Sequence, residues 1–478
     1  MLATPALGEP SQALRQQVEA ILASAPAGTR FGLLVEDDNG NEVIAVNADE
    51  RFIPASNTKL FTTAAALEVM GRDPAAANAQ GTTTLMLAPG KRGMPDVVLT
   101  GGGAALSTAP DCVQRCLNGS LTTIADKAHR VGNVVADDTA FADQRWSPGA
   151  SWNNIGTDSG TAVSAVIVDD NVLPLVVVPG MPGQPAVVTV SPYFALRNET
   201  LTVSKGETRL ALERPVNGRE LRIYGTILRD APAWHETLGI DDPAEYAGWL
   251  VRQGLVARGV QVTGKVVVRH RPPRPPDPRN SSPFPPPASF AISFIPAPLG
   301  EEVAAINKPS QNLHAEALLR RLGKTAGQDI SQQIPAPEGS LEAGLTVLRG
   351  VLAKAGIVRT GYDFSDGSGM STYNRVSPRA AVELLRWGKA QDWGATWRAS
   401  FPIAGVDGTL HRRFIGTPLQ GKLGAKTGTL NASNALSGYL QAASGRELVF
   451  SFFANDVPDG ANAVPIMDAV LLAIAAAN

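Results

Sequence analysis

The chain has 478 residues, of which 44% are hydrophobic and 18% are charged, and its formal net charge is -2. This composition is typical of a globular protein with a large core, and the length exceeds one ordinary domain, so we expect two or three domains. Because the basic residues are not gathered into one run, the charge pattern excludes the basic patch of a nucleic-acid-binding protein.

The two ends of the chain bear on where the protein works. Residues 1–22 (MLATPALGEPSQALRQQVEAIL) lack the basic start, apolar run and small-residue cleavage site of a secretory signal. Residues 464–478 (VPIMDAVLLAIAAAN) are apolar, but they contain Asp468 and are too short to cross a bilayer. We therefore predict a terminal helix packed on its domain, no transmembrane segment, and at most peripheral association with a membrane.

A serine and a lysine precede the first clear helix. Residues 59–70 (KLFTTAAALEVM) contain no Gly or Pro and are followed by Gly71, which predicts a helix. Ser56 then lies at the helix start, with Lys59 one turn further on the same face. A serine needs a base, and a lysine becomes one when burial, a second cation or a helix N-terminus lowers its pKa. An N-cap serine beside a solvated lysine is the alternative interpretation.

The middle of the chain has a different texture. Between about 84 and 300, short apolar runs such as VVLTGGG, AVSAVIVDD and ELRIYGTIL alternate with turn residues, which predicts β-rich structure with few helices. Residues 272–287 (PPRPPDPRNSSPFPPP) predict an extended polyproline connection, with a ligand for a proline-recognition domain as the alternative.

The cysteines and histidines do not predict a metal site. The only cysteines, Cys112 and Cys116, could form a local disulfide or remain two buried thiols, and they are too few for a structural zinc site. The five histidines show no metal-binding spacing, so we expect no metal ion.

Two more polar motifs follow the β-rich region. Ser310-Gln311-Asn312 precedes a helical run, 313–323 (LHAEALLRRLG), and Lys426-Thr427-Gly428-Thr429 precedes the alternating stretch 434–443 (NALSGYLQAA). Taken singly, the first motif could cap its helix and the lysine could be solvated on an edge strand. Taken in order with the Ser56 motif, they resemble the S-x-x-K, S-x-N and K-T-G elements of penicillin-recognising serine acyl-transferases.

Three longer segments narrow this resemblance. Residues 366–378 (DGSGMSTYNRVSP), 401–414 (FPIAGVDGTLHRRF) and 421–440 (GKLGAKTGTLNASNALSGYL) resemble the D-alanyl-D-alanine carboxypeptidase/endopeptidases of the low-molecular-mass class C penicillin-binding proteins. The resemblance implies an α/β (α+β) fold, with a penicillin-binding/β-lactamase-like transpeptidase domain whose antiparallel sheet is flanked by helices, and two inserted β-rich domains. The implied parts are a catalytic domain at 1–83 and 300–478, a domain II at 84–167 that returns with the Pro-rich segment at 266–299, and a nested domain III at 168–265.

The resemblance also implies a role for each catalytic side chain. Ser56 would attack the carbonyl of the penultimate D-alanine, and Lys59 would be the general base, kept partly neutral by nearby Lys426. Ser310 would relay a proton to the departing amine, and Asn312 would hydrogen-bond Lys59 and the substrate amide.

The same resemblance assigns the substrate contacts. Lys426, Thr427 and Thr429 would bind a free C-terminal carboxylate through charge-assisted hydrogen bonds. Gly428 would let the substrate backbone lie against its strand, and the backbone N–H groups of Ser56 and Thr429 would form the oxyanion hole. No cofactor is required.

One segment of the inserted region is a candidate specificity element. Residues 137–154 (DDTAFADQRWSPGASWNN) resemble the segment that, in this family, overhangs the active site and meets the amino end of a diaminopimelate-type side chain. Asp138, Phe141 and Asp143 are the candidates for that contact, and an ordinary turn is the alternative.

The implied function is a serine D,D-carboxypeptidase/endopeptidase that trims peptidoglycan stem peptides outside the cytoplasmic membrane and is trapped covalently by β-lactams. A signal peptide is then expected to have been removed or to be missing from the N-terminus. A β-lactamase or esterase on the same fold is disfavoured, because the chain is longer than a lactamase, has no Glu-x-x-Leu-Asn element and carries Ser-x-Asn in place of Tyr-x-Asn. A non-catalytic wall-binding scaffold is disfavoured because every catalytic side chain is present.

Overall fold

The computed structural model describes residues 12–273, 288–325 and 338–478. The chain forms two compact units: unit 1 comprises Met1–Ala77, Ser147–Ala150 and Ala297–Asn478, and unit 2 comprises Asn78–Trp146 and Ser151–Pro296. Residues 1–11 and 274–287 lie outside the described residues, so the interpretations of the N-terminus and of most of the proline-rich segment stay predictions.

Unit 1 contains a five-stranded antiparallel sheet in the order β2-β1-β22-β21-β20. Its strands are β1 (Arg30–Asp37), β2 (Glu42–Val46), β20 (Leu423–Leu430), β21 (Ser433–Gln441) and β22 (Glu447–Asn455). Because β1 pairs with β22, the N-terminal and C-terminal parts of unit 1 share one sheet. β22 is buried at eight of its nine positions, as expected for a strand covered on both faces.

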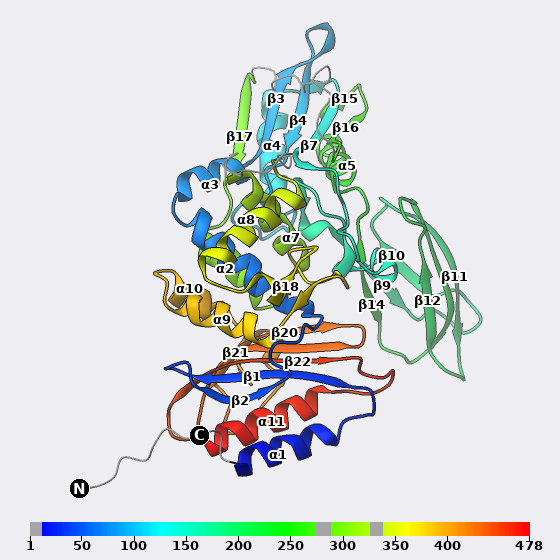
Figure 1. The fold of residues 1–478 in the computed structure, drawn as a ribbon. Helices are drawn as coiled ribbons and strands as arrows, with labels where there is room; N and C mark the ends of the chain where they lie inside the picture. Colours follow the sequence, from blue (N-terminus) through cyan, green and yellow to red (C-terminus); the bar gives the residue numbers. More distant parts are fainter. Residues whose placement is uncertain (1–11, 274–287, 326–337) are drawn as a thin grey trace. The chain divides into compact units, whose positions relative to one another are not determined.

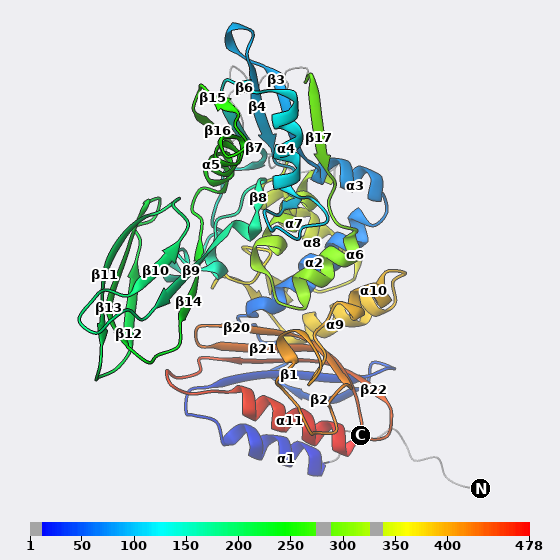
Figure 2. The ribbon, with the colours of Figure 1, turned by 180° about the vertical axis from the view of Figure 1, so that it is seen from behind.

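Helices cover both faces of this sheet. α1 (Gln12–Ala23) and α11 (Val464–Ala477) pack together on one face, and α9 (Pro378–Lys389) packs on the other (Figures 1 and 2). An antiparallel sheet flanked by helices was the fold predicted for the catalytic domain, and it is confirmed, as is the terminal helix. Among the described residues, no helix is long and apolar enough to cross a membrane.

A buried helix forms the centre of the remaining core of unit 1. α2 (Thr58–Met70) is buried at twelve of its thirteen positions, because it is apolar on all sides and other helices pack around it. These helices are α6 (Leu299–Asn307), α7 (Asn312–Thr325), α8 (Leu341–Lys354) and α10 (Gly394–Ala399). The predicted helices 59–70 and 313–323 are thus present with ends that differ by one or two residues, and a short hairpin of β18 (Tyr362–Asp363) and β19 (Arg375–Val376) lies between α8 and α9 in the chain.

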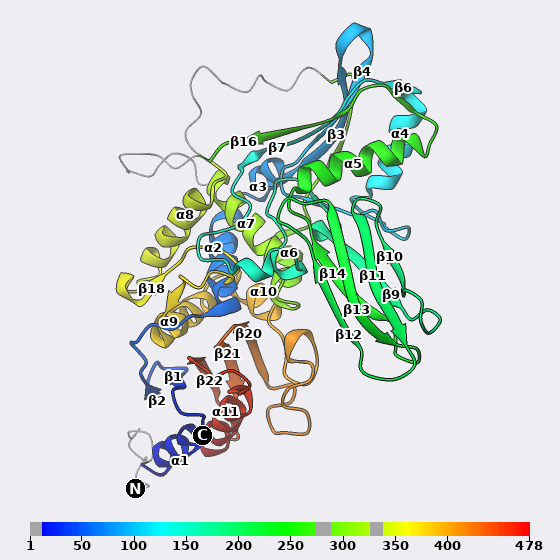
Figure 3. The ribbon, with the colours of Figure 1, turned by 90° about the vertical axis from the view of Figure 1, so that its right-hand side faces the viewer.

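Unit 2 contains a mixed five-stranded sheet in the order β16-β7-β4-β3-β17. Its strands are β3 (Thr83–Pro89), β4 (Pro95–Thr100), β7 (Val134–Ala142), β16 (Val266–Arg271) and β17 (Phe290–Phe294). α4 (Leu117–Lys127) and α5 (Pro243–Val256) bury their apolar faces with this sheet in one core (Figure 3). The sequence interpretation did not place these two helices, although Asp242 caps α5 and Pro243 opens it.

Two three-stranded sheets make a second core in unit 2. One has the order β10-β9-β14 and the other β11-β13-β12. Their strands are β9 (Val172–Val178), β10 (Val187–Val190), β11 (Ala195–Val203), β12 (Arg209–Glu213), β13 (Glu220–Leu228) and β14 (Trp234–Gly239). This β-rich stretch has its own apolar cluster, and the proposed division into a nested domain remains a prediction.

The smaller elements complete the description. They are α3 (Pro74–Gly81), β5 (Ala105–Leu106), β6 (Arg130–Val131), β8 (Ile167–Val168) and β15 (Gln261–Val262). Cys112 and Cys116 form a disulfide, which decides between the two states that the sequence left open.

Candidate active site

Ser56 lies in a tight turn at the start of α2. The turn is a single 3-10 segment (Ala55–Asn57) in which Ala55 adopts the left-handed conformation, with φ of 46°. Two glycines let other segments approach it. A Cβ at Gly369 would lie 1.9 Å from the Ala55 carbonyl oxygen, and one at Gly428 would lie 3.0 Å from the Ser56 nitrogen. The turn is therefore held between the loop of Gly369 and strand β20.

Lys59 is fully buried, and its amine points at the Ser56 hydroxyl. Lys59 Nζ lies 2.8 Å from Ser56 Oγ, 2.7 Å from Asn312 Oδ1 and 2.7 Å from the Ser368 carbonyl oxygen. The last two atoms are carbonyl oxygens and can only accept, so they take two N–H protons. A neutral amine then has its lone pair left for the proton of Ser56, which is the arrangement of a general base.

Burial is the main reason why Lys59 can be neutral. Desolvation lowers the pKa of Lys59 to about 7, against the attraction of the buried carboxylates Asp366 and Glu316, which raises it. Burial, and to a smaller extent repulsion from Lys59, lowers the pKa of Lys426 well below its ordinary value. The second cation was expected to keep Lys59 neutral, but at Lys59 itself desolvation is the dominant cause.

Lys426 joins the second and third motifs. It lies on β20, is fully buried, and donates to Ser310 Oγ at 2.8 Å and to the Thr427 carbonyl oxygen at 3.0 Å. Ser310 has a φ of 68°, which is unfavourable for a residue with a side chain and is typical of functional sites. Hydrogen bonds within unit 1 thus link the residues predicted to be catalytic into two groups. The Lys59 group contains Ser56, Lys59 and Asn312. The Lys426 group contains Ser310 and Lys426. The bond from Asn57 Nδ2 to the Lys426 carbonyl oxygen, 2.9 Å, ties the two groups together.

Two buried carboxylates shape the loop that faces Lys59. Glu316, one turn after Asn312 on α7, accepts from the backbone N–H groups of Gly367 and Ser368, both at 2.9 Å. Asp366 accepts from the N–H groups of Gly369 at 2.9 Å and Ser371 at 2.6 Å. These bonds fix the loop 366–371, which presents the Ser368 carbonyl oxygen to Lys59.

The two carboxylates differ in their readiness to ionise. Burial and repulsion from Glu316 raise the pKa of Asp366 to about 6. Burial also opposes ionisation of Glu316, but the Arg320 guanidinium, 2.8 Å away, and the loop hydrogen bonds outweigh it and lower the pKa of Glu316. Sequence reasoning missed both residues, although Glu316 follows Asn312 at helical spacing and Asp366 opens one of the resembling segments.

Of the carboxylate-binding residues predicted on β20, Lys426 is buried, Thr427 is half-buried and Thr429 is exposed. Thr427 Oγ1 lies 2.6 Å from Thr409 Oγ1, and Thr429 is exposed. Thr409 belongs to the loop 401–414, where its N–H donates to the Lys308 carbonyl oxygen at 3.1 Å. Asp407 of the same loop pairs with Lys308 at 2.5 Å. This loop therefore connects the residues that precede the second motif to the strand that carries the third.

Comparison with known proteins identifies the family. The family described as D-Ala-D-Ala carboxypeptidase 3 (S13) matches residues 14–475. The chain belongs to this family. It is 33% identical to the D-alanyl-D-alanine carboxypeptidase of Actinomadura sp. (strain R39), over 99% of this chain and 87% of that one. It is a serine-type D-Ala-D-Ala carboxypeptidase.

More distant relatives agree in fold. The D-alanyl-D-alanine carboxypeptidase DacB of Haemophilus influenzae is 23% identical over 93% of this chain and 89% of that protein. The crystal structure of penicillin binding protein 4 (dacB) from Haemophilus influenzae matches with a TM-score of 0.77 at 22% identity, covering 95% of this chain and 97% of that one. The fold predicted for this S13 carboxypeptidase is therefore shared with a penicillin-binding protein.

The predicted specificity residues of this S13 carboxypeptidase lie in unit 2 and are largely engaged there. Asp138 is buried and contacts His270 Nδ1 and Ser164 Oγ, both at 3.0 Å. Phe141 is 2% exposed. Asp143 keeps 28% of its side chain exposed and pairs with Arg145 at 3.1 Å. Asp143 is thus the most accessible of the three, and the binding role of all three stays a prediction.

The structure adds a reason for Gly428 that the sequence did not offer. Its missing side chain leaves room for the Pro54 carbonyl oxygen, 2.8 Å from the position of a Cβ, and for the Ser56 turn. The glycine of the third motif therefore allows β20 to lie against the turn that carries Ser56. Contact with a substrate backbone, as predicted, remains to be tested.

Proposed function

We propose that this carboxypeptidase hydrolyses the D-Ala-D-Ala or D-Ala-diaminopimelate-type bond of peptidoglycan stem peptides through an acyl-enzyme on Ser56. The observation that carries this proposal is the Lys59 amine, 2.8 Å from the Ser56 hydroxyl, with its two other hydrogen bonds made to carbonyl oxygens. A carboxypeptidase hydrolyses the D-Ala-D-Ala bond and releases the terminal D-alanine. An endopeptidase hydrolyses the bond between D-alanine and the diaminopimelate-type residue of a cross-linked peptide. We propose that the same site catalyses both reactions.

Acylation begins with proton transfer from Ser56 to Lys59. Ser56 Oγ bonds to the carbonyl carbon of the penultimate D-alanine while Lys59 Nζ takes the hydroxyl proton. The negative charge on the carbonyl oxygen is stabilised by the backbone N–H groups of Ser56 and Thr429. Asn312 holds both Lys59 and the substrate amide in place.

The carbon–nitrogen bond breaks in the second half of this step. The leaving nitrogen takes a proton from the Ser310 hydroxyl, Ser310 Oγ takes the proton that Lys59 removed from Ser56, and the terminal D-alanine departs as an amine. Lys426 donates to Ser310 Oγ at 2.8 Å and holds that hydroxyl in place. Water then attacks the ester, with Lys59 taking the proton of the water and returning one to Ser56 Oγ. Lys59 therefore begins and ends each half of the reaction as the neutral amine.

The substrate carboxylate is bound by Lys426, Thr427 and Thr429. Lys426 is buried beside uncharged partners, so an incoming carboxylate stabilises its ammonium form and raises its pKa. This coupling favours peptides with a free C-terminus. We further propose that Asp143, with Asp138 and Phe141 shaping its segment, binds the cationic end of a diaminopimelate-type side chain.

β-Lactams enter the same reaction. Penicillin binding protein 4 from Haemophilus influenzae has been solved in complex with a novel β-lactam, at a TM-score of 0.71 and 20% identity to this chain. A β-lactam offers a strained amide and a carboxylate to the groups described above, so we propose that it acylates Ser56. Because the substrate is cell wall, we place the enzyme outside the cytoplasmic membrane, with the periplasm as its compartment.

Intact-protein mass spectrometry tests the acyl-enzyme. Incubation with penicillin should add one drug mass to the wild type and none to Ser56→Ala, while Ser310→Ala, which keeps the nucleophile, should still be labelled, but more slowly. Turnover of a D-Ala-D-Ala peptide and of a cross-linked dimer would then separate the carboxypeptidase from the endopeptidase activity. A labelled peptide that does not contain Ser56 would overturn the proposal.

A further inference from the structure

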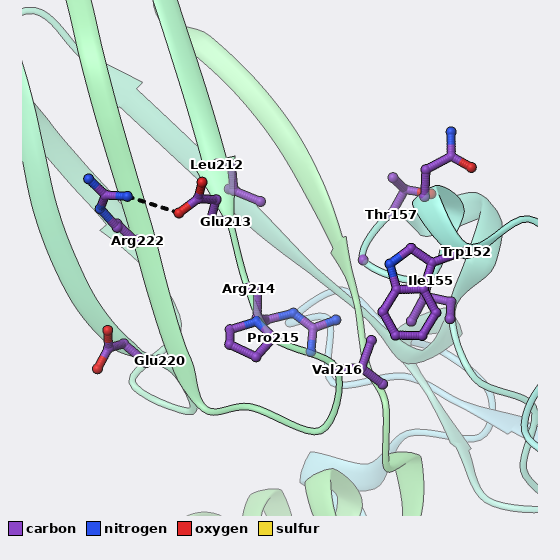
Figure 4. A pocket seen from close by; sticks show the side chains of 12 residues that line it. Trp152, Ile155, Thr157, Leu212, Glu213, Arg214, Pro215, Val216, Glu220 and Arg222 are labelled. Atoms are coloured by element: carbon purple, nitrogen blue, oxygen red, sulfur yellow. Dashed lines mark hydrogen bonds and ion pairs between the residues drawn. The ribbon is translucent and has the colours of Figure 1, made fainter.

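Unit 2 contains a cavity of its own. Its volume is about 600 Å³, and every residue that lines it belongs to unit 2. One wall is the turn that begins with Trp152, and the other is formed by β12, β13 and the segment 214–216 between them (Figure 4). The acyl-transfer reaction uses none of these residues.

The Trp152 wall is apolar and open to solvent. The side chain of Trp152 is 74% exposed, and Ile155, Pro215 and Val216 line the same cavity. Figure 4 shows the indole standing out from its turn, with Val216 and Pro215 on the neighbouring segment. An exposed aromatic ring beside further apolar side chains forms an apolar patch of the kind that marks binding sites, whereas single exposed apolar residues are common on protein surfaces.

The opposite side carries fixed hydrogen-bonding groups. Arg222 donates to Glu213 at 2.9 Å and to Glu199 at 2.7 Å, so its guanidinium is held in position on β13. Arg214 forms two bonds to Asp241, at 2.7 and 2.6 Å, which fixes the floor of the cavity. Because both arginines already have carboxylate partners, the cavity offers oriented hydrogen-bond donors and acceptors, and neither arginine is available to pair with an anionic ligand.

The paired arginines and the exposed indole favour an uncharged ligand that has an apolar face and hydroxyl groups. A stem peptide with free carboxylates would need an unpaired cation, whereas Arg214 and Arg222 are both paired. A sugar ring is uncharged, presents an apolar face that packs on an indole, and carries hydroxyl groups for side chains such as Glu213 and Glu220. The volume lies in the range of small-molecule sites and accommodates more than one ring.

We propose that the Trp152 cavity binds sugar rings of a glycan strand. The inference rests on the proposed function, since a peptidoglycan peptide is attached to such a strand, and it extends that function by a second contact with the same polymer. Trp152 provides the stacking surface, and Glu213, Glu220 and Arg222 bind the hydroxyl groups.

Titration with a peptide-free glycan tests the proposal. The probe is a tetramer of β-1,4-linked N-acetylglucosamine, added to the intact protein after treatment with penicillin and followed by calorimetry and ligand-observed NMR. Wild type should bind, and Trp152→Ala should weaken binding by about tenfold, in line with the contribution of an aromatic contact. Met181→Ala is the matched control, because Met181 is 77% exposed in the same unit and does not line the cavity; it should bind as wild type does.

The proposal is wrong if the tetramer does not bind to wild type, if it binds equally well to Trp152→Ala, or if its binding is weakened equally by Met181→Ala. Binding of a proline-rich or apolar peptide to this cavity in place of the tetramer would also overturn it. Hydrolysis of a short D-Ala-D-Ala peptide should be the same in both variants as in wild type. If wild type does not hydrolyse this peptide, the proposed function is wrong, while the result of the sugar titration still decides whether the cavity binds sugar.

Discussion

The pH dependence of acylation should respond to one buried carboxylate, Asp366. Lys59 must be neutral to accept a proton, so the acylation rate of wild type should rise with pH through about 7, the pKa of Lys59. Asp366 is the first of the charges that raise this pKa. Asp366→Asn removes the charge, so the ammonium form of Lys59 becomes less stable and the rising limb should move to lower pH.

The size of the effect follows from Coulomb's law. At an effective dielectric constant of about 20, two unit charges interact by about 4 kcal/mol at roughly 4 Å and by about half of that at twice the separation, where the interaction equals a pKa change of about 1.5. Asp366 has a pKa of about 6 and is partly protonated where the limb lies, which reduces the effect. We therefore expect the limb to move down by about one pH unit.

The assay is the second-order rate of penicillin acylation, measured by mass spectrometry between about pH 5 and 9. Asp363→Asn is the control, because Asp363 is 45% exposed, pairs with Arg51 and Arg359, and lies near Asp366 in sequence. Asp366→Asn also loses backbone hydrogen bonds, which should lower the plateau rate without moving the limb. A limb that stays in place or moves upward in a folded variant would refute the electrostatic reasoning.

Four further changes test other parts of the site. Lys426→Met should weaken the binding of carboxylate-bearing peptides. It should also move the rising limb of the pH profile upward, but by less than Asp366→Asn moves it down, because the lowered pKa of Lys426 makes this lysine readily neutral. A large upward movement of the limb in penicillin acylation would contradict this expectation. Thr409→Val removes the hydroxyl that contacts Thr427 and should lower kcat/KM by about fivefold, with recovery in Thr409→Ser, as expected for one hydrogen bond. Asp143→Asn should lower kcat/KM about fivefold for a diaminopimelate-like peptide and leave penicillin acylation unchanged, and equal effects on both ligands would dismiss this residue. Hydrogen bonds to two carboxylates raise the pKa of His270 to about 10. The stability that protonated His270 gives to the folded protein is therefore complete below about pH 6.5 and is lost as the pH rises towards 10. His270→Gln should make the melting temperature depend less on pH over that range.

The sequence predicted the parts of the site that follow from local spacing. Ser56 and Lys59 are one helical turn apart, and Ser310 and Asn312 precede a helix, so their local geometry could be inferred without a fold. That these pairs meet Lys426 depended on the resemblance, because the contacts span more than 100 residues of chain. Glu316 and Thr409 were missed because their partners, the loop 366–371 and Thr427, lie outside their own segments. Asp366 was missed because the group on which its charge acts, Lys59, is far away in the sequence.

The fold was predictable to a similar extent. The terminal helix and the strands of unit 2 carry strong local signals, since apolar runs there end at turn residues. α5 was missed although its first residues follow the usual start pattern, because the surrounding region reads as strands. The closure of the sheet of unit 1, where β1 pairs with β22, involves residues more than 400 positions apart and has no local signal.

In the proposed mechanism, the two buried lysines give the free carboxylate of the substrate a role in the proton transfer. In the described structure, Lys426 is bonded to the Ser310 hydroxyl and the Thr427 carbonyl oxygen, which are both uncharged. Burial and Lys59 therefore lower the pKa of Lys426, and its ammonium form becomes favourable when an anion arrives. A charged Lys426 in turn makes protonation of Lys59 less favourable, which keeps Lys59 available as the base. In this mechanism, binding of a C-terminal carboxylate prepares the proton transfer from Ser56, and we expect a peptide with an amidated C-terminus to occupy the site without this preparation.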